Sequence, residues 1–246
     1  MTDLLVPAWP APANVRALQT RRTGGCSPPP WDSFNLGSHV GDALALVATN
    51  RAILREILPA EPLWLQQVHG IAAVNADFEA NLPEADAAIT RRPGRVCAVM
   101  TADCLPVLLC DRAGSVVAAA HAGWRGLAAG VLEATIDKMN VPAGELMAWL
   151  GPAIGPNCFE VGDDVRNAFL GKDTAAAIAF VATSSGKWLA DIYTLARQRL
   201  FAAGVNSIDG GEFCTFTEAE HFFSYRRDGV TGRMASLIWL DHQSGV

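Results

Sequence analysis

Three residues of the chain carry metal-binding side chains and lie where apolar segments end. His69 stands in the segment QVHG, Cys104 in TADCLP and His121 in AAAHAGW. Two imidazoles and one thiolate are ligands that suit zinc, and copper also binds such a set. A structural zinc site needs four protein ligands, whereas three leave a position open for water or substrate. The residue types therefore predict an open metal site formed by His69, Cys104 and His121.

The spacing of these residues does not establish a metal site, because it matches no zinc-finger pattern. Taken singly, each histidine is more often a buried, hydrogen-bonded imidazole, and a cysteine such as Cys104 is more often a small core residue. The remaining histidines lie in polar surroundings, and we expect them to be exposed or locally hydrogen-bonded: His39, His221 and His242.

The segment Arg95–Gly126 must position two of the three ligands. It contains two apolar runs that predict buried strands, with Cys104 after the first and His121 at the end of the second. Residues Asp111–Gly114 predict a tight turn between the strands. Apolar residues at helical spacing follow directly, so His121 is expected at a junction between a strand and a helix.

The other elements follow from hydrophobic periodicity and from Pro and Gly stops. We predict helices over Asp42–Leu58, Arg125–Met139, from near Asp163, and over Leu189–Ala203. We predict strands over Val15–Thr20, Trp64–Ala73, Ala87–Thr90, Leu146–Leu150 and Ala235–Leu240. Pro, Gly and Ser are too dense before Ser38 for a long regular element, so this segment is expected to form a lid or wall of the site. The pattern indicates a mixed α/β (α+β) fold in one domain over residues 1–246.

Composition excludes several classes of protein. The net charge of −6 and the scattered Lys and Arg residues argue against a nucleic-acid surface. The start of the chain lacks the pattern of a secretion signal, and no apolar segment is long enough to span a bilayer, so a cytoplasmic location is expected. Six cysteines without a CxxC pair do not indicate a disulfide framework, and we expect free thiols or metal ligands.

Several motifs in order along the chain carry a resemblance to a known family. They are QVHG at 67–70, TADCLPVLL at 101–109, HAGWRG at 121–126, GPAIG and CFEVG within 151–162, and the closing SYRRDGVTGRMASLIWL. This set resembles the bacterial YfiH/YlmD family, long labelled laccase-domain or polyphenol oxidase proteins and related to mammalian FAMIN. The resemblance implies packed mixed β-sheets flanked by helices, and zinc held by His69, Cys104 and His121.

The resemblance also implies an activity, namely phosphorolysis of adenosine, inosine and S-methyl-5'-thioadenosine, with deamination of adenosine as a second reaction. Beside these purine nucleosides and phosphate, no nucleic-acid or membrane partner is expected, and we expect a monomer. A multicopper laccase needs roughly ten imidazole ligands for its four coppers, whereas this chain has five histidines. Purine nucleoside chemistry therefore fits the residues better.

Candidate residues for this chemistry lie in the same motifs. Cys104 is a candidate catalytic residue as well as a ligand, Asp103 is a candidate proton shuttle, and Arg125 is a candidate contact for phosphate or ribose. Candidate substrate contacts are Arg22, Asn35, Gln67, Arg226 and Arg227. Two other reaction classes stay open. One is a copper-dependent phenol oxidase, and the other is a cysteine hydrolase that uses Cys104 as a nucleophile activated by a histidine.

Overall fold

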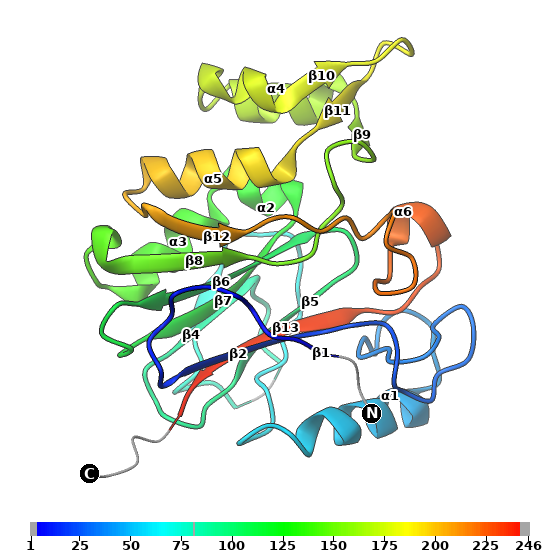
Figure 1. The fold of residues 1–246 in the computed structure, drawn as a ribbon, viewed down its shortest axis with the longest axis vertical. Helices are drawn as coiled ribbons and strands as arrows, with labels where there is room; N and C mark the ends of the chain where they lie inside the picture. The colour runs from blue at the N-terminus through cyan, green and yellow to red at the C-terminus, as the bar shows by residue number, and fades with distance from the viewer. Residues whose placement is uncertain (1–3, 81, 242–246) are drawn as a thin grey trace.

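A computed structural model of the protein describes residues 4–80 and 82–241. Figure 1 traces these residues from the N-terminus in blue to the C-terminus in red. The strands are β1 Leu4–Leu5, β2 Val15–Thr20, β3 Ala73–Asn75, β4 Ala87–Thr90, β5 Cys97–Thr101, β6 Leu105–Asp111, β7 Val117–Ala122, β8 Leu146–Leu150, β9 Glu160–Val161, β10 Phe180–Ala182, β11 Trp188–Ala190, β12 Ser207–Gly210 and β13 Met234–Leu240. The α-helices are α1 Leu44–Arg55, α2 Trp124–Ala129, α3 Val131–Met139, α4 Asp163–Leu170, α5 Ile192–Ala202 and α6 Tyr225–Asp228, and the 3-10 helices are η1 Ala143–Glu145 and η2 Thr174–Ala179.

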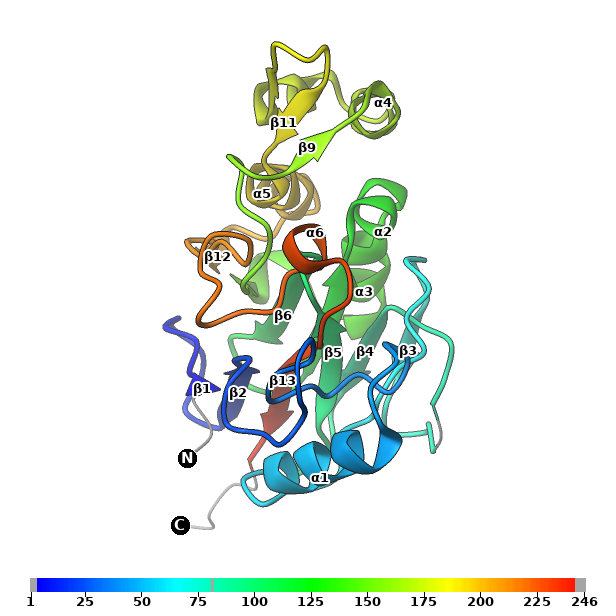
Figure 2. The same cartoon turned by 90° about the vertical axis from the view of Figure 1, so that its right-hand side faces the viewer.

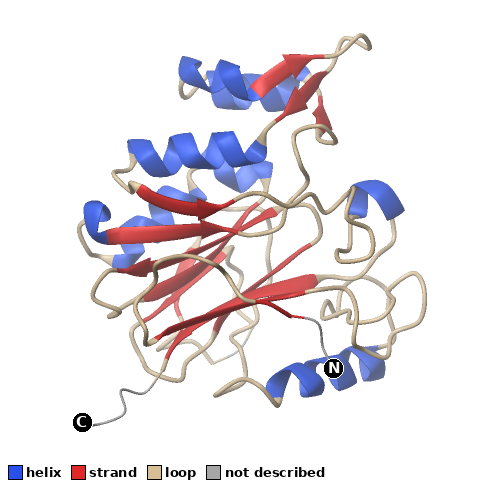
Figure 3. Ribbon diagram, in the orientation of Figure 1, coloured by secondary structure: helices blue, strands red, loops and turns tan. Residues whose placement is uncertain are grey.

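Three sheets are formed by the described strands. The largest has six strands in the order β12-β8-β6-β7-β4-β3, in which the outer pairs β12–β8 and β4–β3 are parallel and the inner pairs are antiparallel. A four-stranded antiparallel sheet has the order β1-β2-β13-β5. A small sheet of β10, β11 and β9 lies with α4 at one end of the molecule (Figure 3).

Alternating residues of the buried strands build two different cores. In β6, Val107 and Leu109 pack with α3 and α5, whereas Leu108 and Cys110 face the four-stranded sheet. This follows from the two-residue period of a strand, which sends successive side chains to opposite faces. Because both faces are covered, β6 and β7 are continuous apolar runs that are buried throughout.

The second sheet is covered in turn by α1. Leu54 of this helix packs with Met100 of β5 and Leu237 of β13 on the outer face of the four-stranded sheet. The layers are therefore helices, six-stranded sheet, four-stranded sheet and helix, which Figure 2 shows with α1 and α3 on opposite sides of the strands. This arrangement confirms the expected mixed α/β fold with packed sheets flanked by helices. The expectation of a single domain over residues 1–246 stays a prediction.

The prediction of two strands around the metal ligands was wrong in one respect. The first apolar run is two strands, β5 in the four-stranded sheet and β6 in the six-stranded sheet, and residues 102–104 cross between them. Asp103 adopts a positive φ of 85° at this crossing. Cys104 therefore follows the first of these strands, as expected, but it lies where the chain passes from one sheet to the other, immediately before β6.

The predicted strand over Trp64–Ala73 was also wrong. Within this segment Gln66 forms an isolated bridge, and β3 starts only at its last residue, Ala73. His69 has a φ of 60°, and the N–H groups of residues 68–70 point to a carboxylate instead of a neighbouring strand. The chain therefore forms a tight turn that presents His69.

Two predicted helices differ from the observed ones for local reasons. The helix over Arg125–Met139 is divided into α2 and α3 at Gly130, whose φ of 116° is incompatible with a continuous helix. The helix predicted from Leu189 starts at Ile192, because the Asp191 carboxylate accepts hydrogen bonds from two backbone N–H groups of the first turn. Residues 188–190 form β11 instead.

The remaining predicted elements are confirmed, including the helix from Asp163 and the strands β2, β4, β8 and β13. The N-terminal loop is a wall of the site, because Ser38 and His39 line the cavity described below. All six cysteines are free thiols, as expected. Within the described part of the chain, no helix has the length and apolar character that crossing a membrane requires.

Candidate metal centre

His69, Cys104 and His121 come together from three separate segments. Their ligand atoms lie within 4.8 Å of one another. The Cys104 Sγ is 3.7 Å from the His69 Nε2, and the two imidazole rings lie edge to face with centroids 4.8 Å apart. His121 is buried at the end of β7, whereas His69 is exposed and Cys104 half-buried. The site is thus open on the His69 side.

The donor set fits a tetrahedral zinc ion. Zn–S and Zn–N bonds of about 2.3 and 2.1 Å at the tetrahedral angle place sulfur and nitrogen about 3.6 Å apart. The observed separation of 3.7 Å between Cys104 Sγ and His69 Nε2 agrees with this value. The His121 Nδ1 is hydrogen-bonded elsewhere, so its Nε2 is the nitrogen available to a metal. Three residues of this chain therefore form a candidate metal site with one open position.

A buried carboxylate that the sequence did not single out orients two of these ligands. Asp86, immediately before β4, is fully buried, and its Oδ1 lies 2.8 Å from His121 Nδ1. The same carboxylate accepts hydrogen bonds from the backbone N–H groups of Val68, His69 and Gly70. Burial opposes the charged form of Asp86, but these hydrogen bonds and the His121 charge lower its pKa overall. Asp86 therefore remains an anion that fixes both histidines.

Cys104 and His121 form a coupled pair of titratable groups. Burial opposes the thiolate, but the charge and hydrogen bonds of the two histidines outweigh it and lower the pKa of Cys104 to about 6. Burial likewise opposes the charged His121 imidazole, and the charges of Cys104 and Asp86 raise its pKa to about 9. The thiolate form that metal binding requires is therefore favoured near neutral pH.

Glycines allow the three ligand segments to approach closely. A Cβ atom at Gly123 would lie 2.8 Å from the His69 ring and 3.1 Å from Cys104 Sγ. A Cβ atom at Gly126, in α2, would lie 2.7 Å from the carbonyl oxygen of Gly70. All three distances are shorter than ordinary van der Waals contacts. The glycines of HAGWRG therefore bring α2 directly against the turn that carries His69.

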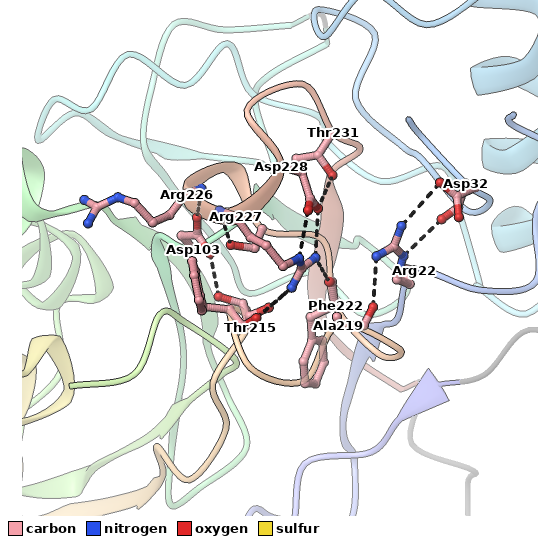
Figure 4. Close-up of polar contacts among 12 residues, drawn as sticks. Arg22, Asp32, Asp103, Thr215, Ala219, Phe222, Arg226, Arg227, Asp228 and Thr231 are labelled. Atoms are coloured by element: carbon pink, nitrogen blue, oxygen red, sulfur yellow. Dashed lines mark hydrogen bonds and ion pairs between the residues drawn. The ribbon is translucent and has the colours of Figure 1, made fainter. Parts of the chain in front are cut away.

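Asp103 precedes Cys104 in the chain, and its buried carboxylate contacts the segment 215–226 (Figure 4). Its Oδ1 accepts a hydrogen bond of 2.6 Å from the Thr215 hydroxyl, and its Oδ2 accepts one of 2.7 Å from the Arg226 backbone N–H. Asp103 does not line the cavity next to the metal ligands. Its observed contacts fix the crossing between β5 and β6 against the segment 215–226.

The three arginines predicted to contact substrate are instead bonded to groups of the protein itself (Figure 4). Arg22 donates to the carbonyl oxygens of Asp32 and Ala219 and forms an ion pair of 3.3 Å with Asp32. The Arg227 guanidinium donates to the carbonyl oxygens of residues 215, 216 and 222. The Arg226 side chain extends away from Arg227 and donates to the Glu160 carbonyl oxygen. The structure does not bring these arginines to the cavity.

The other predicted contacts divide between the cavity and its surroundings. The Gln67 side chain lines the cavity, and its amide exchanges two hydrogen bonds with the backbone of Met100. Arg125 is exposed on α2 and stacks on Trp124, with 4.4 Å from its Cζ to the ring centroid. Asn35 is fully buried and is bonded within the N-terminal loop and to the backbone of Arg233.

A cavity of about 710 Å³ opens onto the metal ligands. It is large enough for a small organic molecule. Four side chains on its wall were not selected from the sequence, which gave no spacing signal for them: His39, Arg51, Tyr225 and Arg233. Of the other histidines, His221 packs against Phe222, with ring centroids 6.1 Å apart, and His242 lies outside the described residues.

Comparison with known proteins shows the family to which the chain belongs. Residues 16–241 match the family described as multi-copper polyphenol oxidoreductase laccase. The chain belongs to this family. It is 56% identical over 243 residues to the Escherichia coli (strain K12) protein named purine nucleoside phosphorylase YfiH, covering 98% of this chain and 100% of the relative. It is 56% identical over 241 residues to the Pseudomonas aeruginosa protein named purine nucleoside phosphorylase PA4543, covering 98% and 99%.

Solved structures agree with the sequence relatives in fold. Neisseria meningitidis protein NMB0706 superposes with a TM-score of 0.94 at 55% identity, covering 97% of this chain and 99% of that one. YlmD from Geobacillus stearothermophilus superposes with a TM-score of 0.85 at 31% identity, covering 94% and 93%. The resemblance to the YfiH/YlmD family inferred from the sequence motifs is therefore confirmed.

Proposed function

We propose that this protein is a zinc-dependent purine nucleoside phosphorylase. The observation that carries the proposal is the open His69–Cys104–His121 donor set, which lines a cavity of about 710 Å³. The names of the E. coli and P. aeruginosa relatives, which cover almost the whole chain, support the reaction class. Adenosine, inosine and S-methyl-5'-thioadenosine are the proposed substrates, with inorganic phosphate as the second reactant.

A zinc ion at this site would supply a Lewis acid with one open position and would activate a bound water for deamination of adenosine, the proposed second reaction. The chain's own residues have three tasks. Asp86 fixes the tautomer of His121, the histidines hold Cys104 as a thiolate, and the cavity walls separate the substrate from bulk water. Gln67, which faces the cavity, is the proposed contact to the base or sugar.

The candidate residues that do not face the cavity receive positioning roles in this proposal. Asp103 holds the turn that presents Cys104, and Asn35 holds the N-terminal loop. Arg125 stacks on Trp124 at the N-terminal end of α2, outside the cavity lining. We therefore propose no proton transfer through Asp103 and no direct substrate contact for Arg22 or Arg226.

The family description names a multicopper oxidase, which is the principal competing function. Four coppers require roughly ten imidazoles. The chain has five histidines, and the part described by the structure holds one cluster with metal-ligand geometry. A single thiolate–imidazole centre does not supply the four-electron store of a laccase. Oxygen uptake with a phenol, measured on protein whose metal content is known, separates the two functions.

A cysteine hydrolase is favoured by one observation, namely the lowered pKa of Cys104 beside His121. The two hypotheses predict opposite effects of metal chelation on activity. A hydrolase that uses Cys104 as nucleophile would keep its activity after metal removal, whereas the proposed phosphorylase would lose it.

The proposal is tested by incubating the purified protein with inosine or adenosine, with and without inorganic phosphate, and measuring release of the base. We expect release that depends on phosphate and is abolished in His69→Ala, Cys104→Ala and His121→Ala, together with the bound metal. The matched control is Cys110→Ala, which removes a buried thiol that is not a ligand. Full activity in a metal-free ligand variant would refute the role of the metal.

A further inference from the structure

A cluster of three basic side chains lines the cavity that also contains the metal ligands. It consists of Arg51 from α1, His39 from the N-terminal loop and Arg233 from the residue before β13. We propose that these three residues form a binding site for a phosphate oxyanion, and that free inorganic phosphate occupies it as the second reactant. The assignment of phosphate as reactant rests on the proposed function, whereas the oxyanion site rests on the geometry alone.

Both guanidinium groups lack an acidic partner. Arg51 donates from Nε and Nη2 to the Leu36 carbonyl oxygen at 3.0 and 2.8 Å and lies over the Trp64 ring at 4.2 Å. Arg233 donates from Nη1 to the carbonyl oxygens of Thr231 and Gly232, each at 3.1 Å. Throughout residues 4–80 and 82–241, no carboxylate forms an ion pair with either arginine. Two guanidinium groups that line the cavity are thus without an ion-pair partner in the described part of the chain.

The electrostatics show that both arginines are partly shielded from water and that both act on His39. Burial lowers the pKa of Arg51, against the opposing charge of Glu61, and burial lowers that of Arg233, against the charges of Cys104 and Asp103. The pKa of His39 is lowered mainly by its partial burial and further by the positive charges of Arg233 and Arg51. At both arginines burial outweighs the opposing negative charges, and partial burial of a positive charge costs free energy. A bound anion removes that cost.

The surrounding structure holds the cluster in place. The Asn35 Oδ1 accepts hydrogen bonds of 2.9 Å from both the Gly37 and the Arg233 backbone N–H groups. A Cβ atom at Gly37 would lie only 2.7 Å from the Arg233 Cγ, so the loop packs tightly on this side chain. The Leu36 carbonyl ties the same loop to Arg51. Three segments that are distant in sequence therefore meet at the cluster.

The chemistry of the cluster suits a tetrahedral oxyanion such as phosphate. A guanidinium presents planar pairs of N–H donors that fit two phosphate oxygens, and neutral His39 adds one N–H donor. Tyr225, which is exposed on the same cavity wall, adds a hydroxyl. Together they offer several hydrogen-bond donors, and among the described residues no carboxylate lines this cavity.

The position of the cluster suits its role in phosphorolysis. It shares one cavity with His69, Cys104 and His121, so a nucleoside bound there can meet both. A phosphate oxygen forms the new bond to C1' of the ribose while the bond from C1' to the base nitrogen breaks. The electron pair leaves with the base, which takes up the proton that the phosphate loses. The arginines bind the dianion and hold its attacking oxygen towards the sugar.

The test measures binding of inorganic phosphate to the zinc-loaded protein by calorimetry, without nucleoside and therefore without turnover. We expect the dissociation constant to rise about tenfold or more in Arg51→Gln and in Arg233→Gln, as expected for loss of charge-assisted hydrogen bonds. The exposed His39→Ala variant tests the cluster without disturbing the core, and it should weaken binding by a smaller factor. Zinc content and circular dichroism confirm that each variant is folded and loaded. Arg112→Gln, an exposed arginine at the far end of β6, is the matched control.

Unchanged binding in all three cluster variants would overturn the proposal, because it would show that phosphate binds to the metal alone. No phosphate binding by the native protein would also overturn it. A parallel titration with adenosine 5'-monophosphate distinguishes free from esterified phosphate, and binding of the nucleotide without binding of phosphate would contradict the second-reactant assignment. Failure of base release in the functional assay would leave the binding result intact, so the two proposals fail separately.

Discussion

At the scale of single residues, the candidate metal centre depends on one carboxylate. Asp86 contacts both histidine segments, with its Oδ1 on His121 and both oxygens on the N–H groups of residues 68–70. A backbone turn at His69 with a φ of 60° needs such support, because a non-glycine residue rarely adopts this conformation. Asp86 therefore fixes the geometry of the ligands, although it is not one of the three candidate ligands itself.

Replacement of this carboxylate tests that claim. In Asp86→Asn the amide keeps the shape, but its NH₂ group cannot accept hydrogen bonds from the turn. We expect zinc affinity to fall about 10- to 100-fold, as is usual for the partners of metal-bound histidines. Competition with a chromophoric chelator measures the affinity. The exposed Asp137→Asn on α3 is the control, and equal affinities for the two variants would contradict the role of Asp86.

The coupled titration of Cys104 and His121 gives a pH dependence for the metal-free protein. Because the folded-state pKa of Cys104 is lowered to about 6, its thiolate persists above that pH and is lost as the pH falls through it. Alkylation by iodoacetamide should therefore rise with a midpoint near pH 6, and His121→Ala should move the midpoint upward. Mass spectrometry assigns the labelled residue, with buried Cys97 as an internal unlabelled reference. A midpoint near that of a free thiol would contradict the coupling.

At the scale of elements, the site is assembled by close contact between α2 and the turn at His69. Gly126→Ala would force a Cβ atom against the Gly70 carbonyl oxygen, which is backbone and cannot rotate away. We expect a stability loss of about 1–3 kcal/mol, typical of overpacking, together with weaker zinc binding. Urea unfolding and chelator competition measure both quantities.

Gly144→Ala is the matched control for this substitution, because its Cβ atom would meet nothing within 4 Å. We expect both its stability and its zinc affinity to stay close to those of the native protein. Native behaviour of Gly126→Ala would show that α2 does not constrain the ligand turn.

Elements with their own local signals were predictable from the sequence, and those set by distant contacts were not. The apolar runs of β6, β7 and β13 are buried on both faces, so their composition alone indicated strands. The strand predicted at residues 64–73 failed because its N–H groups bond to Asp86, which is remote in sequence. The change of sheet at residues 102–104 was missed, because the apolar residues on either side indicate buried strands but not which sheet each strand joins.

The same distinction applies to the site. His69, Cys104 and His121 were selected by their residue types and by family motifs, and the structure brings their ligand atoms together. The two arginines of the proposed phosphate site were not selected. Arg51 lies within a helix and Arg233 within a loop, and neither has a motif that sets it apart. Their common cavity exists only after the N-terminal loop has packed between them.

At the scale of the whole molecule, a bound metal would link three segments that belong to different parts of the fold. His69 lies in a loop, Cys104 at the crossing between the two sheets and His121 at the end of β7. A ligand that binds only the folded state stabilises it by about 2.7 kcal/mol when the free ligand concentration is one hundred times the dissociation constant. Removal of the metal should therefore lower the melting temperature by roughly 5–10 °C.

Scanning calorimetry before and after chelation measures this shift. Cys104→Ser is the control, because a variant with a weakened site should melt at the same temperature with and without chelator. A native protein whose melting temperature is insensitive to chelation would contradict a linking role for the metal.

The central claim is that the His69–Cys104–His121 centre supports phosphorolysis of purine nucleosides, and one measurement tests it most directly. Metal-free protein is reloaded with zinc or with copper and mixed with inosine and inorganic phosphate, and ³¹P NMR follows the phosphate. The account predicts stoichiometric formation of ribose 1-phosphate and hypoxanthine by the zinc protein and none by the metal-free protein or by His121→Ala. Absence of ribose 1-phosphate from inosine and from the other proposed nucleosides, with zinc bound at one equivalent, would contradict it.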